Sequence, residues 1–306
     1  MVSVGNLSVG GTGKTPMVRW LAETMISRAV RTAVVSRGYG GSAGPGPVVV
    51  SEGDGPRCDA TVCGDEPWML AHTVPDVLVV VGSNRTEGAR KAIELGARLI
   101  LLDDGFQHRA LARDMDIVLL DRTRPFDRDR LLPGGRLREP ASALARADWI
   151  VLTRSASPDG AERLQAAIRA ANPKAPILHA DHHPSGFFDA LGAEVERPSR
   201  AIAFCGIGNP ARFRADLEGL GIAVAGFTAA HDHRRVGPRR LERLRAEAAD
   251  QEATLVTTEK DLARIGPATA QRYGVTVLSI QTRLSDEQRL IDAIARLHAG
   301  QPSRAG

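Results

Sequence analysis

The stretch Val4–Pro16, VGNLSVGGTGKTP, organises the first part of this 306-residue chain. A short apolar run leads into a glycine-rich turn, then Lys14-Thr15, then a helical pattern. This order is typical of a phosphate-binding loop, in which backbone N–H groups surround the phosphates, the lysine reaches the β- and γ-oxygens, and the threonine hydroxyl ligates Mg²⁺. The positive end of the following helix favours the same anion. Ser8 stands where the usual pattern has glycine.

We therefore expect this loop to bind ATP together with Mg²⁺. Its assigned residues are Ser8, Val9, Gly10, Gly11, Thr12, Gly13, Lys14 and Thr15. The alternative is a glycine-rich turn without a ligand. Lysine occurs only at positions 14, 91, 174 and 260, which fits a requirement for its compact ammonium group at Lys14.

Composition narrows the class of protein. Hydrophobic residues make up 43% of the chain, enough for a sizeable core, and the formal charge of +4 does not indicate nucleic-acid binding. The three cysteines, Cys58, Cys63 and Cys205, lack the spacing of a zinc site and fit a reducing compartment. No apolar run has the length of a transmembrane helix, so we expect a protein that is soluble or peripheral at a membrane.

Apolar runs alternate with helical patterns in the first half of the chain. The candidate strands are Val2–Val4, Ala33–Ser36, Val77–Val81, Leu99–Leu102, Ile117–Leu120 and Trp149–Leu152. The helical segments are Pro16–Val30, Arg85–Gly96 and Ala141–Ala147, and Val48–Ser51 is expected as an excursion from the sheet. Runs that are apolar throughout indicate strands buried on both faces. The pattern predicts an α/β fold, a P-loop domain with a doubly wound, mostly parallel sheet.

A second, smaller α/β domain is expected after a stretch, from about Ser155 to Arg200, where the pattern weakens to one helix at Gly160–Ala171. Its candidate strands are Ala201–Cys205, Ile222–Ala225, Thr254–Thr257 and Val275–Ile280, and its helices are Pro210–Glu218, Pro238–Ala248 and Asp286–His298. Residues 1–190 are therefore expected to form the nucleotide-binding domain and residues 200–306 the smaller one, with a linker at about 185–200.

Acidic residues follow the strands where a ligand is expected. Asp103 and Asp104 come after an apolar strand downstream of the loop, as does the Mg²⁺ ligand of many nucleotide hydrolases and kinases. The alternative for this pair is a solvated polar turn. Asp65 and Glu66 follow Gly64 at a helix start, where a helix cap and a catalytic carboxylate are compatible roles.

Other polar clusters are harder to rank. Arg37, Arg136 and Arg138 lie in glycine-rich loops and are suited to bind an anion. An acid beside an imidazole, as needed for proton transfer, occurs at both 231–233 and 181–183. Composition does not distinguish these two clusters.

Together these motifs resemble the tetraacyldisaccharide 4′-kinase family of lipid A biosynthesis. The matching stretches are VGNLSVGGTGKTP (4–16), SRGYGG (36–41), GDEP (64–67), DDGFQH (103–108), LLPGGRLREP (131–140), FCGIGNP (204–210), Asp232-His233 and TTEKD (257–261). They follow the family's order over nearly the whole chain, and the first, fourth and fifth form a highly specific combination. Ala230 departs from the pattern, which typically has Phe there, and family members usually carry an apolar helix before the loop.

The resemblance implies an ATP-dependent lipid kinase. It would phosphorylate the 4′-hydroxyl of tetraacyldisaccharide 1-phosphate, a lipid A precursor, to give lipid IVA at the cytoplasmic face of the inner membrane of a Gram-negative bacterium. It also implies two α/β domains with the active site between them. No nucleic acid and no obligate protein partner are inferred.

The resemblance implies a role for each site residue. Asp65 and His233 are the implied catalytic pair, with Lys14 on the phosphates, and His182 and His183 become bystanders because the family histidine follows the GIGNP stretch. The expected metal ligands are Thr15, Asp103, Asp104 and Glu139, and the expected substrate contacts are Arg37, Arg136 and Arg138. Two other functions use a similar loop: an ATP-dependent ligase of the dethiobiotin-synthetase type, and an ATP-gated assembly or partition factor.

Overall fold

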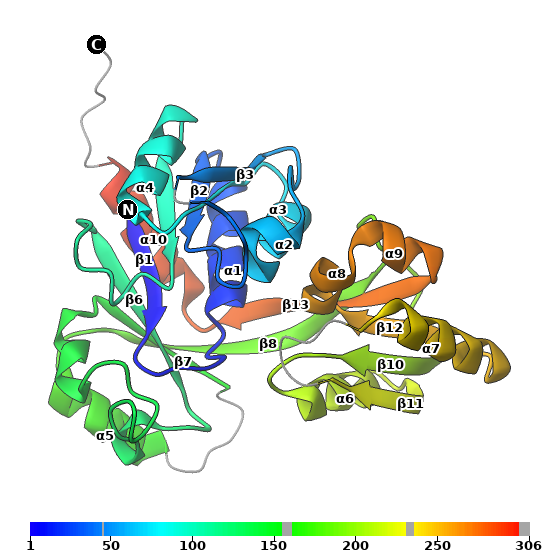
Figure 1. The fold of residues 1–306 in the computed structure, drawn as a ribbon. Coiled ribbons are helices and arrows are strands. Elements are labelled where there is room, and N and C mark those ends of the chain that lie inside the picture. The colour runs from blue at the N-terminus through cyan, green and yellow to red at the C-terminus, as the bar shows by residue number, and fades with distance from the viewer. Residues whose placement is uncertain (45, 155–160, 231–235, 300–306) are drawn as a thin grey trace.

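The computed structural model describes residues 1–44, 46–154, 161–230 and 236–299. In this part of the chain the strands form one sheet that runs through the molecule, in the order β11-β10-β12-β13-β8-β7-β6-β1-β5-β2-β4-β3, with β9 beside β8 (Figure 1). The strands are β1 (Val2–Asn6), β2 (Thr32–Ser36), β3 (Val48–Glu52), β4 (Leu78–Val81), β5 (Leu99–Asp103), β6 (Met115–Asp121), β7 (Trp149–Thr153), β8 (Ile177–Phe188), β9 (Glu194–Val195), β10 (Arg200–Cys205), β11 (Ala223–Ala229), β12 (Thr254–Thr258) and β13 (Val275–Leu284).

Helices connect most of these strands. They are α1 (Lys14–Ile26), α2 (Ala60–Cys63), α3 (Asp65–Thr73), α4 (Arg85–Glu94), α5 (Ala161–Ala171), α6 (Pro210–Gly219), α7 (Pro238–Asp250), α8 (Glu259–Ile265), α9 (Pro267–Arg272) and α10 (Glu287–Ala299), with 3₁₀ turns η1 (Phe126–Arg128) and η2 (Ala141–Arg146). All pairings among β4, β2, β5, β1, β6 and β7 are parallel, as the buried apolar runs predict.

The central sheet is covered on both faces. Val34 and Leu101 belong to the hydrophobic cluster that also contains residues of α1 and α3, whereas their neighbours Val35 and Leu102 pack in a second cluster with Ala89 of α4. Successive side chains of a strand point to opposite faces, so a strand between two helical layers must be apolar throughout. The predicted doubly wound α/β fold is confirmed.

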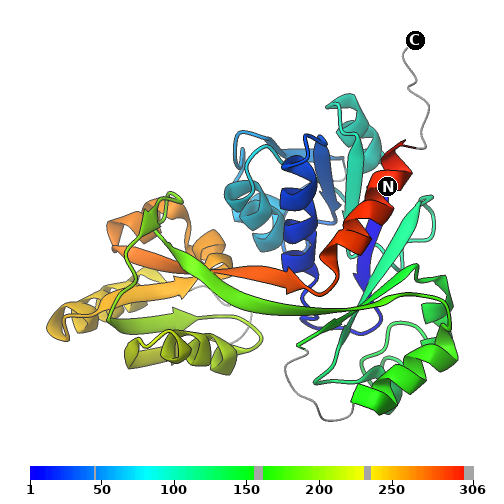
Figure 2. The same ribbon diagram turned by 180° about the vertical axis from the view of Figure 1, so that it is seen from behind.

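The two parts of the molecule are joined through the sheet itself. β8 pairs in parallel with β7 and antiparallel with β13, whose other neighbour, β12, belongs to the smaller part. After β13 the chain returns to the first part, where α10 lies beside β1 and α1 (Figures 1 and 2). Leu290 and Ile291 are buried there, and the Arg289 guanidinium lies 5.8 Å from the centre of the Trp149 ring.

Two local predictions differ from the structure, and one long strand was missed. Val48–Ser51 is not an excursion: it forms β3, antiparallel to β4 at the sheet edge. Ala141–Ala147 forms the 3₁₀ turn η2 in place of an α-helix. The long strand β8 was not predicted, because Pro184 and Gly186 interrupt its apolar pattern. The division into residues 1–190 and 200–306, with a linker at about 185–200, stays a prediction. The structure adds that α10, from the second of these ranges, lies in the first part of the molecule.

Gly5 of β1 shows why the first motif begins with glycine. A Cβ atom added there would lie 2.5 Å from the Cβ of Phe106 and 2.8 Å from its backbone nitrogen. Phe106 is fully buried, so the DDGFQH segment closes directly over β1. The close approach places the acidic residues at the end of β5 beside the loop that follows β1.

We predict that Gly5→Ala lowers the free energy of unfolding by about 1–3 kcal/mol, because the added methyl group overpacks the contact with Phe106. Urea titration measures the change. Gly219→Ala is the control, since an added Cβ at Gly219 meets no atom within 4 Å. Equal stability of the two variants would show that the contact at Gly5 is not close in solution.

Candidate active site

The phosphate loop connects β1 to α1, and contacts between its own residues hold its conformation. Gly13 caps the helix with φ 86° and ψ 20°, a left-handed conformation that glycine adopts without strain. The Asn6 side-chain amide donates to the Thr12 hydroxyl at 2.9 Å, and both residues are buried. Thr15 is buried in the first turn of α1, where its hydroxyl is available to a metal ion at the phosphates. The sequence-predicted strand, loop and helix are thus present at this site.

The segment 131–140 forms one wall of the phosphate loop. The Val9 N–H donates to the Arg136 carbonyl at 2.8 Å, and the Arg138 N–H donates to the Leu7 carbonyl at 2.9 Å. Because these contacts use only backbone atoms, the side chains of the segment are free to make other contacts around the loop. The sequence motif LLPGGRLREP therefore belongs to the same site as GGTGKTP.

Asp104 is the acid that the loop lysine contacts. Its carboxylate lies 3.5 Å from Lys14 Nζ and accepts two hydrogen bonds from Arg138 Nη1, at 2.8 and 2.9 Å. Burial would raise the pKa of Asp104, but the positive charges of Lys14 and Arg138 and the hydrogen bond from Arg138 hold it below its usual value. Two cations that are suited to phosphate oxygens thus share one carboxylate here.

Asp103, the last residue of β5, has a different environment. It is 3% exposed, and Ser36 Oγ donates to its Oδ2 at 3.2 Å, while Oδ1 has no hydrogen-bond partner among the described residues. Burial raises the pKa of Asp103 to about 6, and the nearby Glu66 carboxylate adds to the shift. A bound cation would compensate both effects, so Asp103 and the Thr15 hydroxyl fit the oxygen donors that Mg²⁺ takes from proteins.

The remaining predicted site residues, one acid and two arginines, differ in the contacts that they make. Glu139 accepts from Gln107 at 3.2 Å and from Arg146 at 2.9 Å, so its assignment to the metal remains a prediction. Arg136 Nε donates to Asp129 at 2.7 Å. Arg37 is exposed and, in the described part of the chain, makes no ion pair, so its guanidinium is not engaged by a carboxylate there and its assignment to the substrate remains a prediction.

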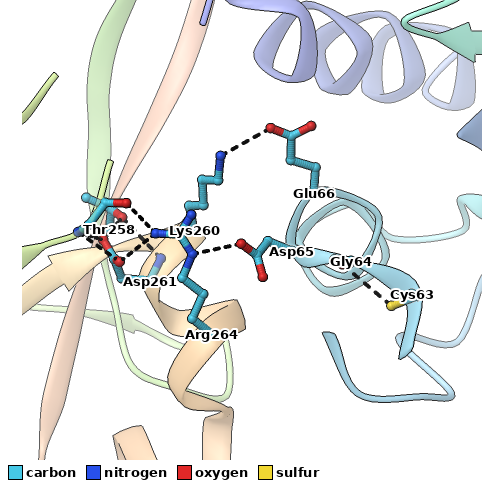
Figure 3. A network of polar contacts seen from close by, with 9 residues as sticks. Cys63, Gly64, Asp65, Glu66, Thr258, Lys260, Asp261 and Arg264 are labelled. Carbon is cyan, nitrogen blue, oxygen red and sulfur yellow. Dashed lines mark hydrogen bonds and ion pairs between the residues drawn. The ribbon is translucent and has the colours of Figure 1, made fainter. Parts of the chain in front are cut away.

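Asp65 opens α3 and meets the smaller part of the molecule (Figure 3). Its Oδ2 accepts from Arg264 Nε of α8 at 2.7 Å, and the neighbouring Glu66 accepts from Lys260 Nζ at 3.3 Å. Arg264 is itself buried and also contacts Asp261 at 3.3 Å, while Asp261 accepts from the Gly206 N–H at 3.0 Å. The start of α3 and the helix α8 therefore face each other across the junction of the two parts.

A cavity of about 230 Å³ lies at this junction. Its lining comes from the SRGYGG loop, α2, α3 and α8, and comprises Tyr39, Gly40, Ala60, Thr61, Asp65, Glu66, Lys260 and Arg264. A carboxylate therefore borders a cavity to which both parts contribute, as a base for a hydroxyl substrate requires.

Sequence reasoning missed Arg264, although it lies on the helix that begins within the TTEKD motif. Glu66, expected as a helix cap or a catalytic carboxylate, pairs with Lys260. The expectation that His182 is a bystander stays a prediction, and its ring lies against Gly13 of the phosphate loop. His233 lies outside the described residues, so its pairing with Asp65 remains a prediction.

The fold and this site define a P-loop nucleotide-binding protein with a kinase-like pair of acidic clusters. Residues 1–299 match the family model described as tetraacyldisaccharide-1-P 4′-kinase, LpxK. The chain belongs to this family, and the resemblance drawn from the motifs is confirmed.

Individual relatives agree with the family model. The tetraacyldisaccharide 4′-kinase of Anaeromyxobacter dehalogenans is 44% identical over 283 residues, which cover 90% of this chain and 74% of that one. That of Chlorobium phaeovibrioides is 38% identical over 312 residues, covering 97% and 88%. The crystal structure of LpxK from Aquifex aeolicus in complex with ATP aligns with a TM-score of 0.76 at 32% identity and covers 97% of this chain and 88% of that one. The ligase and partition-factor alternatives are not favoured.

We predict that Arg264→Gln lowers the free energy of unfolding by about 3–5 kcal/mol, because it leaves the buried Asp261 carboxylate without its cation. Urea unfolding followed by circular dichroism measures the loss. Arg245→Gln, at an exposed site of α7, is the matched control and should change stability by less than about 0.5 kcal/mol. If both variants are equally stable, the ion pairs of Arg264 do not hold the junction together.

Proposed function

We propose that this chain transfers the γ-phosphoryl group of ATP to the 4′-hydroxyl of tetraacyldisaccharide 1-phosphate, a lipid A precursor, giving lipid IVA and ADP. Family membership supports the reaction. One observation supports the assignment as a kinase above all: Lys14 pairs with Asp104, next to Asp103 at the end of β5, and both acids lie beside the glycine-rich loop that follows β1. Phosphoryl transfer depends chiefly on such positioning and charge neutralisation.

The phosphate loop from Ser8 to Thr15 is proposed to hold the triphosphate, with Lys14 on its β- and γ-oxygens. Lys14 then exchanges the Asp104 carboxylate for phosphate, and Arg138 keeps Asp104 ionised meanwhile. Thr15, Asp103 and Asp104 are the residues proposed to hold Mg²⁺, with Glu139 as a further candidate. When bound, Mg²⁺ neutralises charge on the β- and γ-phosphates.

Asp65 is proposed as the general base. It accepts the proton of the 4′-hydroxyl as the new oxygen–phosphorus bond forms and the bond to ADP breaks, so the products are the phosphate ester, ADP and one proton. His233 is proposed to orient Asp65 or relay the proton. Arg37 is proposed to bind the 1-phosphate or the transferring phosphoryl group, with Arg136 and Arg138 as further candidates.

The product assay tests the reaction itself. Incubation with γ-labelled ATP and tetraacyldisaccharide 1-phosphate should place the label in the lipid at the 4′ position. Labelled inorganic phosphate without labelled lipid would contradict a kinase and favour a ligase or an ATP-driven switch.

Two substitutions separate the proposed roles. Asp65→Ala should slow turnover by about 10²–10⁴-fold with a modest change in the KM for ATP, because general-base catalysis is lost while the loop is intact. Asp59→Ala, at an exposed acid near the start of α2, is the control. Lys14→Ala should lose more activity, and an active Lys14→Ala protein would contradict the nucleotide assignment.

We also propose that the protein works at a membrane surface, the cytoplasmic face of the inner membrane of a Gram-negative bacterium. Among the described residues no helix is long and apolar enough to cross a bilayer. The contact is assigned to the 128–134 tip of the loop that walls the phosphate site. Leu131 and Leu132 are 48% and 50% exposed there, next to the exposed Arg128 and Arg130. Apolar side chains beside arginines suit an anionic lipid surface.

Vesicle co-sedimentation tests this contact. Replacing Leu131 and Leu132 together by Ser should weaken binding to phosphatidylglycerol vesicles about tenfold or more, because each leucine loses its apolar transfer free energy. The double variant Ile93→Ser and Leu191→Ser is the control, since these residues are as exposed (60% and 63%) but lie elsewhere. Equal binding by both double variants would contradict the assignment of the tip.

A further inference from the structure

The phosphate loop has a neighbour that the proposed mechanism does not use. A Cβ atom added to Gly13 would lie 2.7 Å from Nε2 of His182, in the middle of β8. Thr153 of β7 lies on the same side, with its methyl group 3.6 Å from that position. The imidazole edge therefore fills the space beside Gly13, the residue that both caps α1 and precedes Lys14.

The His182 ring is held from the opposite direction by Thr282 of β13, and its backbone is held by the smaller part of the molecule. His182 pairs with Thr282 of β13 in the antiparallel ladder, and its Nδ1 lies 3.1 Å from the Thr282 hydroxyl. Its backbone carbonyl accepts from Arg212 of α6 at 2.9 Å. The loop and β13 thus meet at the His182 side chain, and the smaller part contacts the backbone of the same residue.

The unused nitrogen of this ring faces the loop. Nε2 is buried and has no hydrogen-bond partner among the described residues. Burial, assisted by the Arg154 charge, lowers the pKa of His182 to about 4, so the ring is neutral near pH 7. A neutral imidazole with Nδ1 paired to a hydroxyl retains one free hydrogen-bonding position. A buried polar atom without a partner costs free energy. A ligand that supplies the partner on binding would remove this cost.

We propose that His182 is a positioning residue for the nucleotide phosphates. Its ring edge holds Gly13 in the left-handed conformation from which the loop N–H groups face the phosphates, and Nε2 gains its partner when the loop closes on a di- or triphosphate. The inference rests on the proposed nucleotide role of the loop. It gives the strand pair β8–β13 a direct contact with the nucleotide site.

Kinetics of the full-length protein test the inference. His182→Ala should raise the KM for ATP and the inhibition constant of ADP about tenfold, with the KM for the lipid substrate unchanged, because only the phosphate loop loses its support. His182→Gln, whose amide can replace Nε2, should recover most of the loss. His183→Ala is the matched control, since the adjacent side chain points to the other face of β8 and should leave both constants unchanged.

The outcomes distinguish the inference from the function on which it rests. If Lys14→Ala abolishes ADP inhibition but His182→Ala leaves it intact, the role of His182 is wrong and the nucleotide site stands. If Lys14→Ala also leaves ADP inhibition intact, the nucleotide assignment itself fails. A loss in His182→Ala that is equal for ATP and lipid, and that His182→Gln does not recover, would show a general structural role and overturn the proposal.

Discussion

β8 and β13 pair antiparallel from Ala180 opposite Leu284 to Phe188 opposite Val277, and this ladder turns two α/β arrangements into one sheet. The first part of the molecule contributes the phosphate loop and α3, and the second contributes α8. Without the ladder, Asp65 and Arg264 would lie on separate bodies with a short-lived contact. Because backbone hydrogen bonds fix the register of the ladder, they also fix which side chains meet across the junction.

Charge at the site is balanced before any nucleotide arrives. Lys14 and Arg138 neutralise Asp104, and Arg264 and Lys260 neutralise Asp65 and Glu66. The Asp103 carboxylate makes no ion pair with a cation of the described residues, and its burial, together with the Glu66 charge, raises its pKa. The site therefore holds cations that suit phosphate and a buried carboxylate that suits a metal ion, so in the proposed mechanism nucleotide binding exchanges existing partners instead of burying new charge.

Much of this site could be predicted from the sequence. The phosphate loop and the acids that end β5 are contiguous motifs, whose chemistry depends on spacing along one strand–loop–helix unit. The ladder could not be predicted, because Pro184 and Gly186 break the pattern of β8 and pairing between distant segments leaves no local signal. The order of the family motifs made His182 a bystander, and its contact with Gly13 could not be predicted because that contact is made across the sheet.

Two ion pairs have to change partners in the proposed reaction. As the proposed base, Asp65 has to leave or share Arg264 to act on a hydroxyl, and Lys14 has to leave Asp104 to reach phosphate. Each exchange is a rearrangement of side chains that are already within contact distance. No refolding of the sheet is required for either one.

A crystal structure with Mg²⁺ and a non-hydrolysable ATP analogue would show the exchange of partners at Lys14 directly. We expect the triphosphate in the loop from Ser8 to Thr15, Lys14 Nζ on a phosphate oxygen, and Asp103 beside the metal ion. An analogue bound elsewhere, with the contact of Lys14 and Asp104 intact, would contradict this expectation.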